Sequence, residues 1–215
     1  MARPGLTVAC ALLLAAGGAT RAREAAAGAC GGSLNVAAPA DGKTAPNAAV
    51  LLVGYSYGGL KVKVLNAGKE IPITIIDDWP GGSGRCASSY ILLRPAKGDW
   101  PAGAALDVEV DGYGKYKVLT GTARDVTAPR GVLGPVRRPG LFSDERYLPF
   151  KGVSDDRGPF VRLTFAIKGY PRAKDLTLAA DAAGEILFNK GDVCESVVLT
   201  DLAGNTLKFG PEVCK

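Results

Sequence analysis

The chain has 215 residues, of which 47% are hydrophobic and 22% are charged; its net charge is +5 and it contains no histidine. These proportions are typical of globular proteins, so global disorder is excluded, and the length allows one or two domains. The missing histidine removes the commonest general base and metal ligand, and the scattered basic residues, without stacking aromatics beside them, argue against a nucleic-acid interface.

Residues 1–29 are predicted to be a signal peptide. Arg3 gives a short basic start, and Leu6–Ala16 is an apolar run of 11 residues followed by small residues. This length suits a signal peptide and is too short to span a bilayer. No later apolar run approaches the ~18 residues of a membrane helix, so no membrane span is expected. We therefore expect an exported protein, located in the periplasm, on the outer surface or in the medium.

Four cysteines remain once Cys10 is removed with the signal peptide. An even number of cysteines in an exported protein predicts disulfides, and four cysteines allow three connectivities. We favour Cys30–Cys86 and Cys194–Cys214, because each pair then lies within one predicted domain. In the alternative, an envelope lipoprotein, Cys30 carries a lipid anchor and Cys86 is left unpaired.

The region 30–124 is predicted to form one antiparallel β-sandwich. Short apolar or alternating segments are separated by turns rich in glycine and proline, at the spacing typical of sandwich strands. Pro72 falls inside one segment and cannot donate a ladder hydrogen bond, so that strand is expected at an edge or a bulge. The expected strands are 34–36, 50–53, 60–64, 71–75, 90–95, 106–110 and 116–122.

The region 125–215 is predicted to form a second, smaller sandwich. Residues 125–130 include a proline and polar residues that resist regular structure, which suits a linker. Between residues 127 and 158 the hydrophobic pattern predicts no regular structure except a strand near 132–136. Period-two alternation then returns, and strands are expected at 160–167, 176–179, 186–188, 196–200 and 207–209.

Two turn motifs carry a resemblance to a known family. Pro39-Ala40-Asp41-Gly42 is followed by Pro46-Asn47-Ala48 and an apolar strand, and Asp201-Leu202-Ala203-Gly204-Asn205-Thr206 lies near the end of the chain. Both motifs resemble those of bacterial Ig-like (fibronectin type III-like) domains. The resemblance implies two tandem immunoglobulin-like β-sandwiches, and it bears on the fold more than on the function.

Five aromatic residues lie in or beside predicted turns of the first sandwich, and they are the candidates for a binding surface. Exposed loop aromatics can stack on sugars or anchor a protein partner, so a protein or glycan at the cell envelope is the expected partner. The alternative role of these side chains is to cover the ends of the core. The candidates are Tyr55, Tyr57, Trp79, Trp100 and Tyr113.

Acidic residues also gather in predicted turns, where they could in principle hold a cation. Calcium requires six to eight oxygen ligands, and the spacing here matches no EF-hand. Capping of turns is therefore the expected role, and neither a metal nor a cofactor is predicted. The turns in question hold Asp77 and Asp78, Asp111, Asp155 and Asp156, and Asp201 with Asn205.

No residue of the sequence is predicted to be catalytic. Gly54-Tyr55-Ser56-Tyr57-Gly58 has the spacing of a nucleophile elbow, but that motif needs a following helix and a histidine base. We therefore expect a non-enzymatic exported module for binding or for cell-envelope structure. The alternative from another class is a small secreted hydrolase with a histidine-free site, such as a Ser/Lys or carboxylate pair. The oligomeric state is not predicted.

Overall fold

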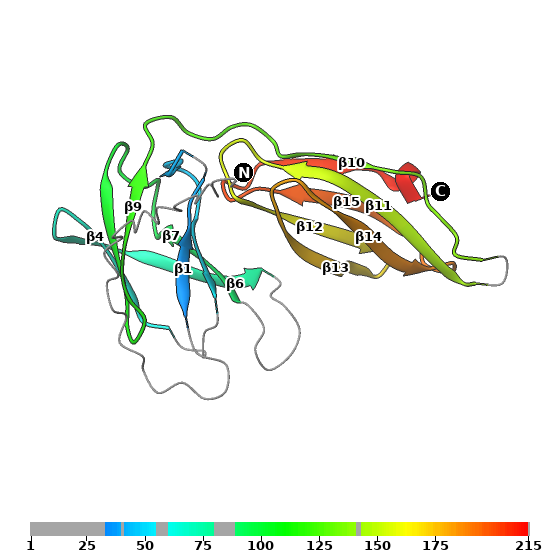
Figure 1. Cartoon of the computed structure of the whole chain (residues 1–215), viewed down its shortest axis with the longest axis horizontal. Coiled ribbons are helices and arrows are strands. Elements are labelled where there is room, and N and C mark those ends of the chain that lie inside the picture. Colours follow the sequence, from blue (N-terminus) through cyan, green and yellow to red (C-terminus); the bar gives the residue numbers. More distant parts are fainter. Residues whose placement is uncertain (1–32, 40, 55–59, 80–88, 141–142, 215) are drawn as a thin grey trace, which may run out of the picture.

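The computed structural model of the protein describes residues 33–39, 41–54, 60–79, 89–140 and 143–214, except for the side chains of residues 77–79. These residues form two sandwich-like bodies, each made of two packed β-sheets, that lie side by side along the molecule (Figure 1). The predicted all-β architecture is confirmed. The predicted signal peptide, Cys30 and Cys86 lie outside the described residues.

The first body is built from one four-stranded and one five-stranded sheet, with the orders β1-β3-β7-β6 and β2-β9-β8-β4-β5. Neighbouring strands are antiparallel, except that β2 and β9 are parallel. The strands are β1 (Leu34–Ala37), β2 (Lys43–Thr44), β3 (Val50–Gly54), β4 (Val62–Asn66), β5 (Lys69–Ile71), β6 (Ile73–Trp79), β7 (Ser89–Pro95), β8 (Ala105–Val110) and β9 (Gly114–Thr120).

Pro72 marks the point where the chain crosses from one sheet of the first body to the other. β5 ends at Ile71 on the edge of the five-stranded sheet, and β6 begins at Ile73 on the edge of the four-stranded sheet. Proline has no N–H to donate, but the Pro72 carbonyl accepts a hydrogen bond from the Ala96 N–H at 2.8 Å. The expected edge position is confirmed, although the single strand predicted over 71–75 is two edge strands.

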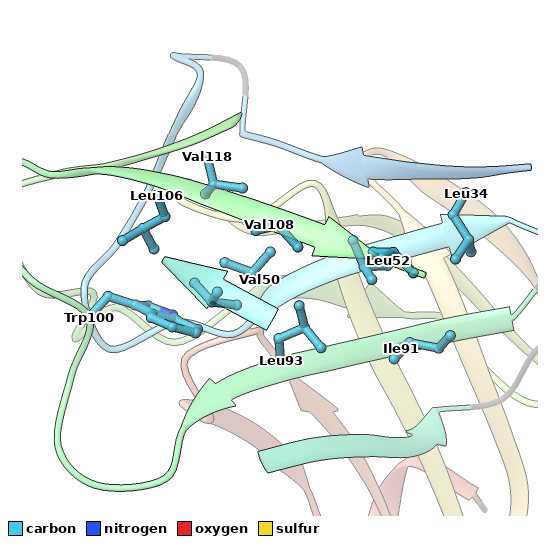
Figure 2. Close-up of a cluster of buried hydrophobic side chains, with 11 residues drawn as sticks. Leu34, Val50, Leu52, Ile91, Leu93, Trp100, Leu106, Val108 and Val118 are labelled. Atoms are coloured by element: carbon cyan, nitrogen blue, oxygen red, sulfur yellow. The ribbon is translucent and has the colours of Figure 1, made fainter. Parts of the chain in front are cut away.

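The core of the first body fills the space between its two sheets (Figure 2). Trp100 closes one end of this core; its side chain is 2% exposed, and its Nε1–H donates to the Ala48 carbonyl at 2.9 Å. The Trp100 backbone N–H also donates to the Pro46 carbonyl at 2.8 Å. Trp100 therefore both fills the core and holds residues 46–48 in place.

The second body has a three-stranded sheet, β10-β11-β14, packed on a four-stranded sheet, β13-β12-β15-β16. Its inward-facing residues form a separate core, in which the rings of Phe165 and Phe188 lie 5.3 Å apart. The elements are β10 (Arg130–Leu133), β11 (Glu145–Ser154), β12 (Phe160–Ile167), β13 (Tyr170–Ala179), β14 (Ala182–Asn189), β15 (Cys194–Thr200), β16 (Thr206–Phe209) and the 3₁₀ turn η1 (Pro211–Cys214).

Three strands of the second body differ from the sequence-based expectation. β11 was not predicted, because Pro149 and Gly152 give it the composition of a turn. It is nevertheless the central strand of its sheet, where Gly152 takes a φ of 60° at a shift in register between Phe150 and Val153. β13 and β14 are longer than predicted, because β13 pairs with β12 and β14 with β11 beyond the short apolar segments from which they were predicted.

Cys194 and Cys214, paired in the sequence-based prediction, form a disulfide with their Cα atoms 6.0 Å apart. The bond joins the start of β15 to the end of η1, so it ties the C-terminal turn to the core of the second body. A structural disulfide indicates an oxidising, extracytoplasmic setting. Among the described residues, no helix is long and apolar enough to cross a membrane.

Removing this disulfide by the double change Cys194→Ala and Cys214→Ala is expected to lower the free energy of unfolding by about 2–3 kcal/mol. The cross-link closes a loop with a sequence separation of 20 residues and so restricts the conformations of the unfolded chain. Its loss raises the conformational entropy of the unfolded chain and thereby favours unfolding. Urea unfolding followed by circular dichroism measures the change. Val193→Ala, an exposed neighbour, is the control, and a double variant as stable as this control would contradict the prediction.

Candidate functional site

The central strands β3 and β7 of the four-stranded sheet are buried on both faces, so this part of the sheet is an internal layer of the molecule. Val50 and Leu52 of β3 point into the core of the first body, whereas Leu51 lies in a different cluster and is equally buried. Leu92 of β7 belongs to that second cluster too. A strand covered on both faces has a continuous apolar run instead of an alternation, as residues 50–53 do.

The second body covers the outer face of this sheet. Leu202, in the turn between β15 and β16, is 4% exposed and packs among first-body residues. Phe160, at the start of β12, packs against the same cluster, and its ring lies edge-on to Tyr90 of β7 at 5.5 Å. We call this cluster the junction core; its buried members are Ala45, Ala48, Ala49, Leu51, Leu92 and Leu202.

Hydrogen bonds to the Leu202 backbone fix the junction core in register. The Leu202 carbonyl accepts from the Ala49 N–H at 2.8 Å and from Arg94 Nη2 at 2.7 Å. Arg94 also donates from Nη1 to the Asn47 carbonyl at 3.4 Å. Burial lowers the pKa of Arg94 and the charge of Asp201 opposes that effect, but a guanidinium stays protonated throughout the physiological range.

Asn47 binds the start of the connection between the two bodies. Its Nδ2 donates to the Asp125 carbonyl at 2.7 Å, and its Oδ1 accepts from the Asp125 N–H at 2.7 Å. Asn205 Nδ2 donates to the same Asp125 carbonyl at 3.3 Å. The backbone of Asp125 is therefore held by one side chain from each body.

The turn that carries Leu202 is itself closed by Asp201 and Asn205. Asp201 is 1% exposed; its Oδ1 accepts from the Asn205 N–H at 2.8 Å and its Oδ2 accepts from Asn205 Nδ2 at 2.9 Å. Gly204 takes a φ of 92°, a conformation that residues with a Cβ rarely adopt. Asp201 thus caps a turn, the role that the sequence predicted for it.

Three carboxylates meet beside this frame. Asp125 begins the connection, and Asp155 and Asp156 follow β11 in the turn before β12. Each residue has a carboxylate oxygen that lies within 4.8 Å of one from each of the other two. We call Asp125, Asp155 and Asp156 the junction carboxylates.

Asp125 is the most buried of the junction carboxylates, at 2% exposed. Burial raises the pKa of Asp125, a hydrogen bond from the Thr127 N–H at 3.1 Å opposes this rise, and the charges of Asp201 and Asp156 add to it. The pKa of Asp125 is raised overall, although Arg157 also opposes the rise. The site therefore brings negative charges close together where water screens them poorly.

Asp155 is the most unusual group of the site. The residue is partly exposed, but both of its carboxylate oxygens are buried and accept no hydrogen bond of normal geometry, because the Arg157 backbone N–H acts on the carboxylate only weakly. Burial is the largest cause that raises the pKa of Asp155 to about 7; the charges of Asp125, Asp201 and Asp156 add to the rise, and the Arg157 backbone N–H opposes it. Buried polar atoms are normally hydrogen-bonded, so this carboxylate lacks a partner that such a position requires.

Asp175, on the face of β13, shows how the same protein satisfies another carboxylate. Its oxygens accept from Arg162 Nε at 2.9 Å, Thr164 Oγ1 at 3.0 Å and Arg172 Nε at 2.7 Å. Burial raises the pKa of Asp175, but the hydrogen bonds from these three residues outweigh it, so the pKa is lowered. Asp175, which is surrounded by donors, therefore contrasts with Asp155, whose oxygens accept no hydrogen bond of normal geometry.

The buried Asp155 carboxylate is expected to make stability depend on pH. Its pKa in the folded protein is about 7 and that of an unfolded aspartate is about 3.9, so between these values the folded state binds more protons. In a chelator, the free energy of unfolding should therefore fall as the pH rises from 5 to 8. If the whole difference between the folded and unfolded pKa values acted on stability, the free energy of unfolding would change by about 4 kcal/mol. We expect roughly 1–2 kcal/mol, because the residue is partly exposed and solvent screens its charge.

The measurement is urea unfolding in EDTA at pH 5 and pH 8, with Asp155→Asn as the test variant. The chain has no histidine, so few other groups titrate in this window. Asp155→Asn should be the more stable protein at pH 8 and should lose little stability between the two values. A variant with the same pH dependence as the original protein would assign the effect to another group.

The structure places the predicted binding aromatics in different surroundings. Trp100 is a core residue, and Tyr113 is partly buried against the first core. The backbone of Trp79 lies in β6 opposite Tyr90, but its side chain is not described. Tyr55 and Tyr57 lie outside the described residues, so the binding role of these aromatics stays a prediction.

Among the acidic candidates, Asp155 and Asp156 come together with Asp125, whereas Asp111 is exposed in the turn between β8 and β9. The sequence identified the Asp155-Asp156 pair only as a solvated loop and placed Asp125 in a linker. The residues that meet here are separated by about thirty positions, and no periodicity connects them. One hint in the sequence was the amide of Asn47. An asparagine side chain has both a donor and an acceptor, so it can bind the carbonyl and the N–H of one distant residue at the same time.

The walls of two surface hollows contain none of the junction carboxylates. One has a volume of about 390 Å³, and its walls include Asp41, Lys43, Thr120, Thr122 and Arg157. The other, of about 190 Å³, lies over Phe165, Ala173 and Phe188 of the second body. Neither wall contains Asp155, so the group with the most displaced pKa does not face either hollow.

Comparisons of the chain with protein-family models, with curated proteins and with solved structures find no match.

Proposed function

We propose that this protein is an exported, non-enzymatic recognition module of the cell envelope, in which two immunoglobulin-like sandwiches act as one rigid unit. The observation that carries the proposal is the junction core, which joins the bodies through a shared apolar layer and through hydrogen bonds to the Leu202 carbonyl. A rigid scaffold of this kind presents loops in a fixed arrangement, which is how loop-based binding modules work.

The strand orders support an immunoglobulin-like assignment of both bodies. β1-β3-β7-β6 and the β9-β8-β4 part of the other sheet have the ABED and GFC orders of an immunoglobulin sandwich. The second body has the same order, with its fourth strand moved to the opposite sheet. The Cys194–Cys214 disulfide agrees with export, because such bonds persist in oxidising compartments.

The recognition surface in this proposal is formed by Tyr55 and Tyr57 of the first body, and a glycan or protein of the envelope is the partner. Trp100 is not part of it, because its side chain lies in the first core. The test is co-sedimentation of the purified mature protein with envelope fragments from the cells that produce it. The original protein should pellet, and the double variant Tyr55→Ala and Tyr57→Ala should bind at least five-fold more weakly. Tyr170→Ala, which removes a 68% exposed tyrosine of the second body, is the matched control.

A protein that remains in the supernatant would overturn the recognition role, and so would equal binding by the double variant and the control. Intact-mass measurement of the same mature protein, with and without reduction, tests export and anchoring. We expect a chain shortened near residue 29, with disulfides and without lipid. A diacylglycerol mass on Cys30 would replace the proposal with an anchored lipoprotein.

A further inference from the structure

We propose that the junction carboxylates Asp125, Asp155 and Asp156 bind a calcium ion, which fastens the connection between the two bodies to the turn that precedes β12. This inference goes beyond the recognition role, because it concerns a cation site where the two bodies meet and does not involve the loop aromatics. It stands on the spacing of the oxygens, on the unsatisfied Asp155 carboxylate and on the way in which the surrounding residues hold the three ligands.

The spacing of the oxygens suits calcium. One oxygen from each residue lies within 4.8 Å of the others. Ligands bound to calcium at 2.3–2.6 Å can be up to about 5 Å apart, whereas those of magnesium, bound at 2.0–2.1 Å, can be only about 4.2 Å apart. The oxygens therefore fit within a calcium coordination sphere with little movement. Magnesium is less suited to the site, because it demands near-ideal octahedral geometry and gives up its water reluctantly.

The chemistry of the donors agrees with that choice. All three side chains are carboxylates, the ligand type that calcium prefers, and the chain contains no histidine that would direct the site toward zinc or copper. Carboxylates can bind with one or both oxygens, so three of them supply between three and six of the six to eight ligands required. Water can reach the remaining positions because Asp156 is exposed.

Asp155 provides a second and independent indication of a ligand. Both of its oxygens are buried, neither accepts a hydrogen bond of normal geometry, the Arg157 backbone N–H acts on the carboxylate only weakly, and one oxygen lies within reach of the other two carboxylates. Its Oδ2 lies only 2.7 Å from the point where a Cβ would stand on Gly158, so a residue with a side chain there would push the carboxylate aside. A buried anion without donors is costly, and a cation bound between the three groups would satisfy it.

No protein cation takes this place in the described part of the chain. Arg94 directs its guanidinium to the Leu202 and Asn47 carbonyls. Arg157 is exposed and forms no ion pair with the three groups, although its charge acts on Asp125. Asp201, nearby, adds a further negative charge and has both oxygens bonded to Asn205.

The site is preorganised on one side. The Asp125 backbone is held by Asn47 from the first body and Asn205 from the second, and Thr127 N–H binds its Oδ1. Binding would therefore need to order only the turn that carries Asp155 and Asp156. With few protein ligands and one exposed residue, we expect a dissociation constant of about 10⁻⁴–10⁻³ M, the range of extracellular calcium modules.

The experiment is isothermal titration calorimetry of the mature protein with CaCl₂ at pH 7.5, after treatment with EDTA and desalting. We expect one site in the range above, and a rise in Tm of about 3–6 °C at a calcium concentration ten times Kd. MgCl₂ should bind at least ten-fold more weakly. Circular dichroism of every variant establishes that the comparison is made on folded protein.

Asp155→Asn and Asp156→Asn are the test variants, and Asp111→Asn, which changes an exposed turn aspartate of the first body, is the matched control. Each test variant should weaken calcium binding at least ten-fold, while the control binds as the original protein does. Asp156 is exposed, so its variant keeps the test valid if Asp155→Asn does not fold. The absence of heat and of a Tm shift up to 10 mM, or equal binding by Asp156→Asn, would overturn the proposal.

Discussion

Trp100→Ala is expected to lower the free energy of unfolding of the first body by about 3–5 kcal/mol. Trp100 is 2% exposed and lies among the aliphatic residues of the first core, so its removal leaves a large cavity (Figure 2). The change also removes the Nε1–H donor of the buried Ala48 carbonyl. An unsatisfied buried acceptor adds to the loss, by about 1–3 kcal/mol when no water replaces the donor.

Trp100→Phe separates these two contributions. Phenylalanine fills most of the cavity but has no donor for Ala48, so we expect this variant to lose about 1–3 kcal/mol. Urea unfolding monitored by circular dichroism gives both values, and Tyr170→Ala on the second body is the control for loss of an exposed ring. If Trp100→Ala were as stable as this control, Trp100 would not be the core residue described above, and its place among the binding aromatics would regain support.

The structure around Trp100 also shows why its role was not decided by the sequence. Asp99-Trp100-Pro101 lies between two strands and has the composition of a turn, so an exposed and a buried indole were both consistent with it. The side chain is buried because residues 46–48, about fifty positions earlier, run past it and offer the Ala48 and Pro46 carbonyls as acceptors. A contact of this sequence separation leaves no periodic signal in either segment.

Strands with a single buried face were predictable, and the reasons are local. Val108 and Val110 of β8 alternate with polar residues because one face of the strand packs on the core and the other meets solvent. Pro72 could be placed at an edge from its missing N–H alone. In contrast, β11 contains Pro149 and Gly152, and its identity as a strand depends on pairing with β10 and β14.

The candidate site was the least predictable part, because it exists only where the two bodies meet. Asp125, Asp155 and Asp201 each occupy a turn-like sequence whose ordinary role is to cap backbone N–H groups, and Asp201 does so. They come close together because the turn between β15 and β16 packs against β3 and β7, which brings the two bodies into contact. The apolar runs at residues 50–53 and 91–93, which lack alternation, were sequence signals that this face is covered.

Leu202→Asp is expected to separate the two bodies while leaving each of them folded. Leu202 is 4% exposed in the junction core, and a carboxylate there would be placed among apolar side chains and close to Asp201. Burying an unpaired charge costs several kcal/mol, so the turn would leave the β3–β7 sheet. The milder Leu202→Ala should keep the contact but lower its stability by about 2–4 kcal/mol.

Double electron–electron resonance between one spin label on each body measures this effect directly. The original protein should give a single narrow distance distribution, and Leu202→Asp should broaden it, because the bodies are then joined only by the connection that starts at Asp125. Leu119→Ala, which truncates a 47% exposed leucine of the first body, is the control and should keep the narrow distribution. A narrow distribution in Leu202→Asp would mean that the Asn47–Asp125 hydrogen bonds suffice to hold the bodies together. In that case the rigidity on which the proposed function rests would come from the connection, not from the junction core.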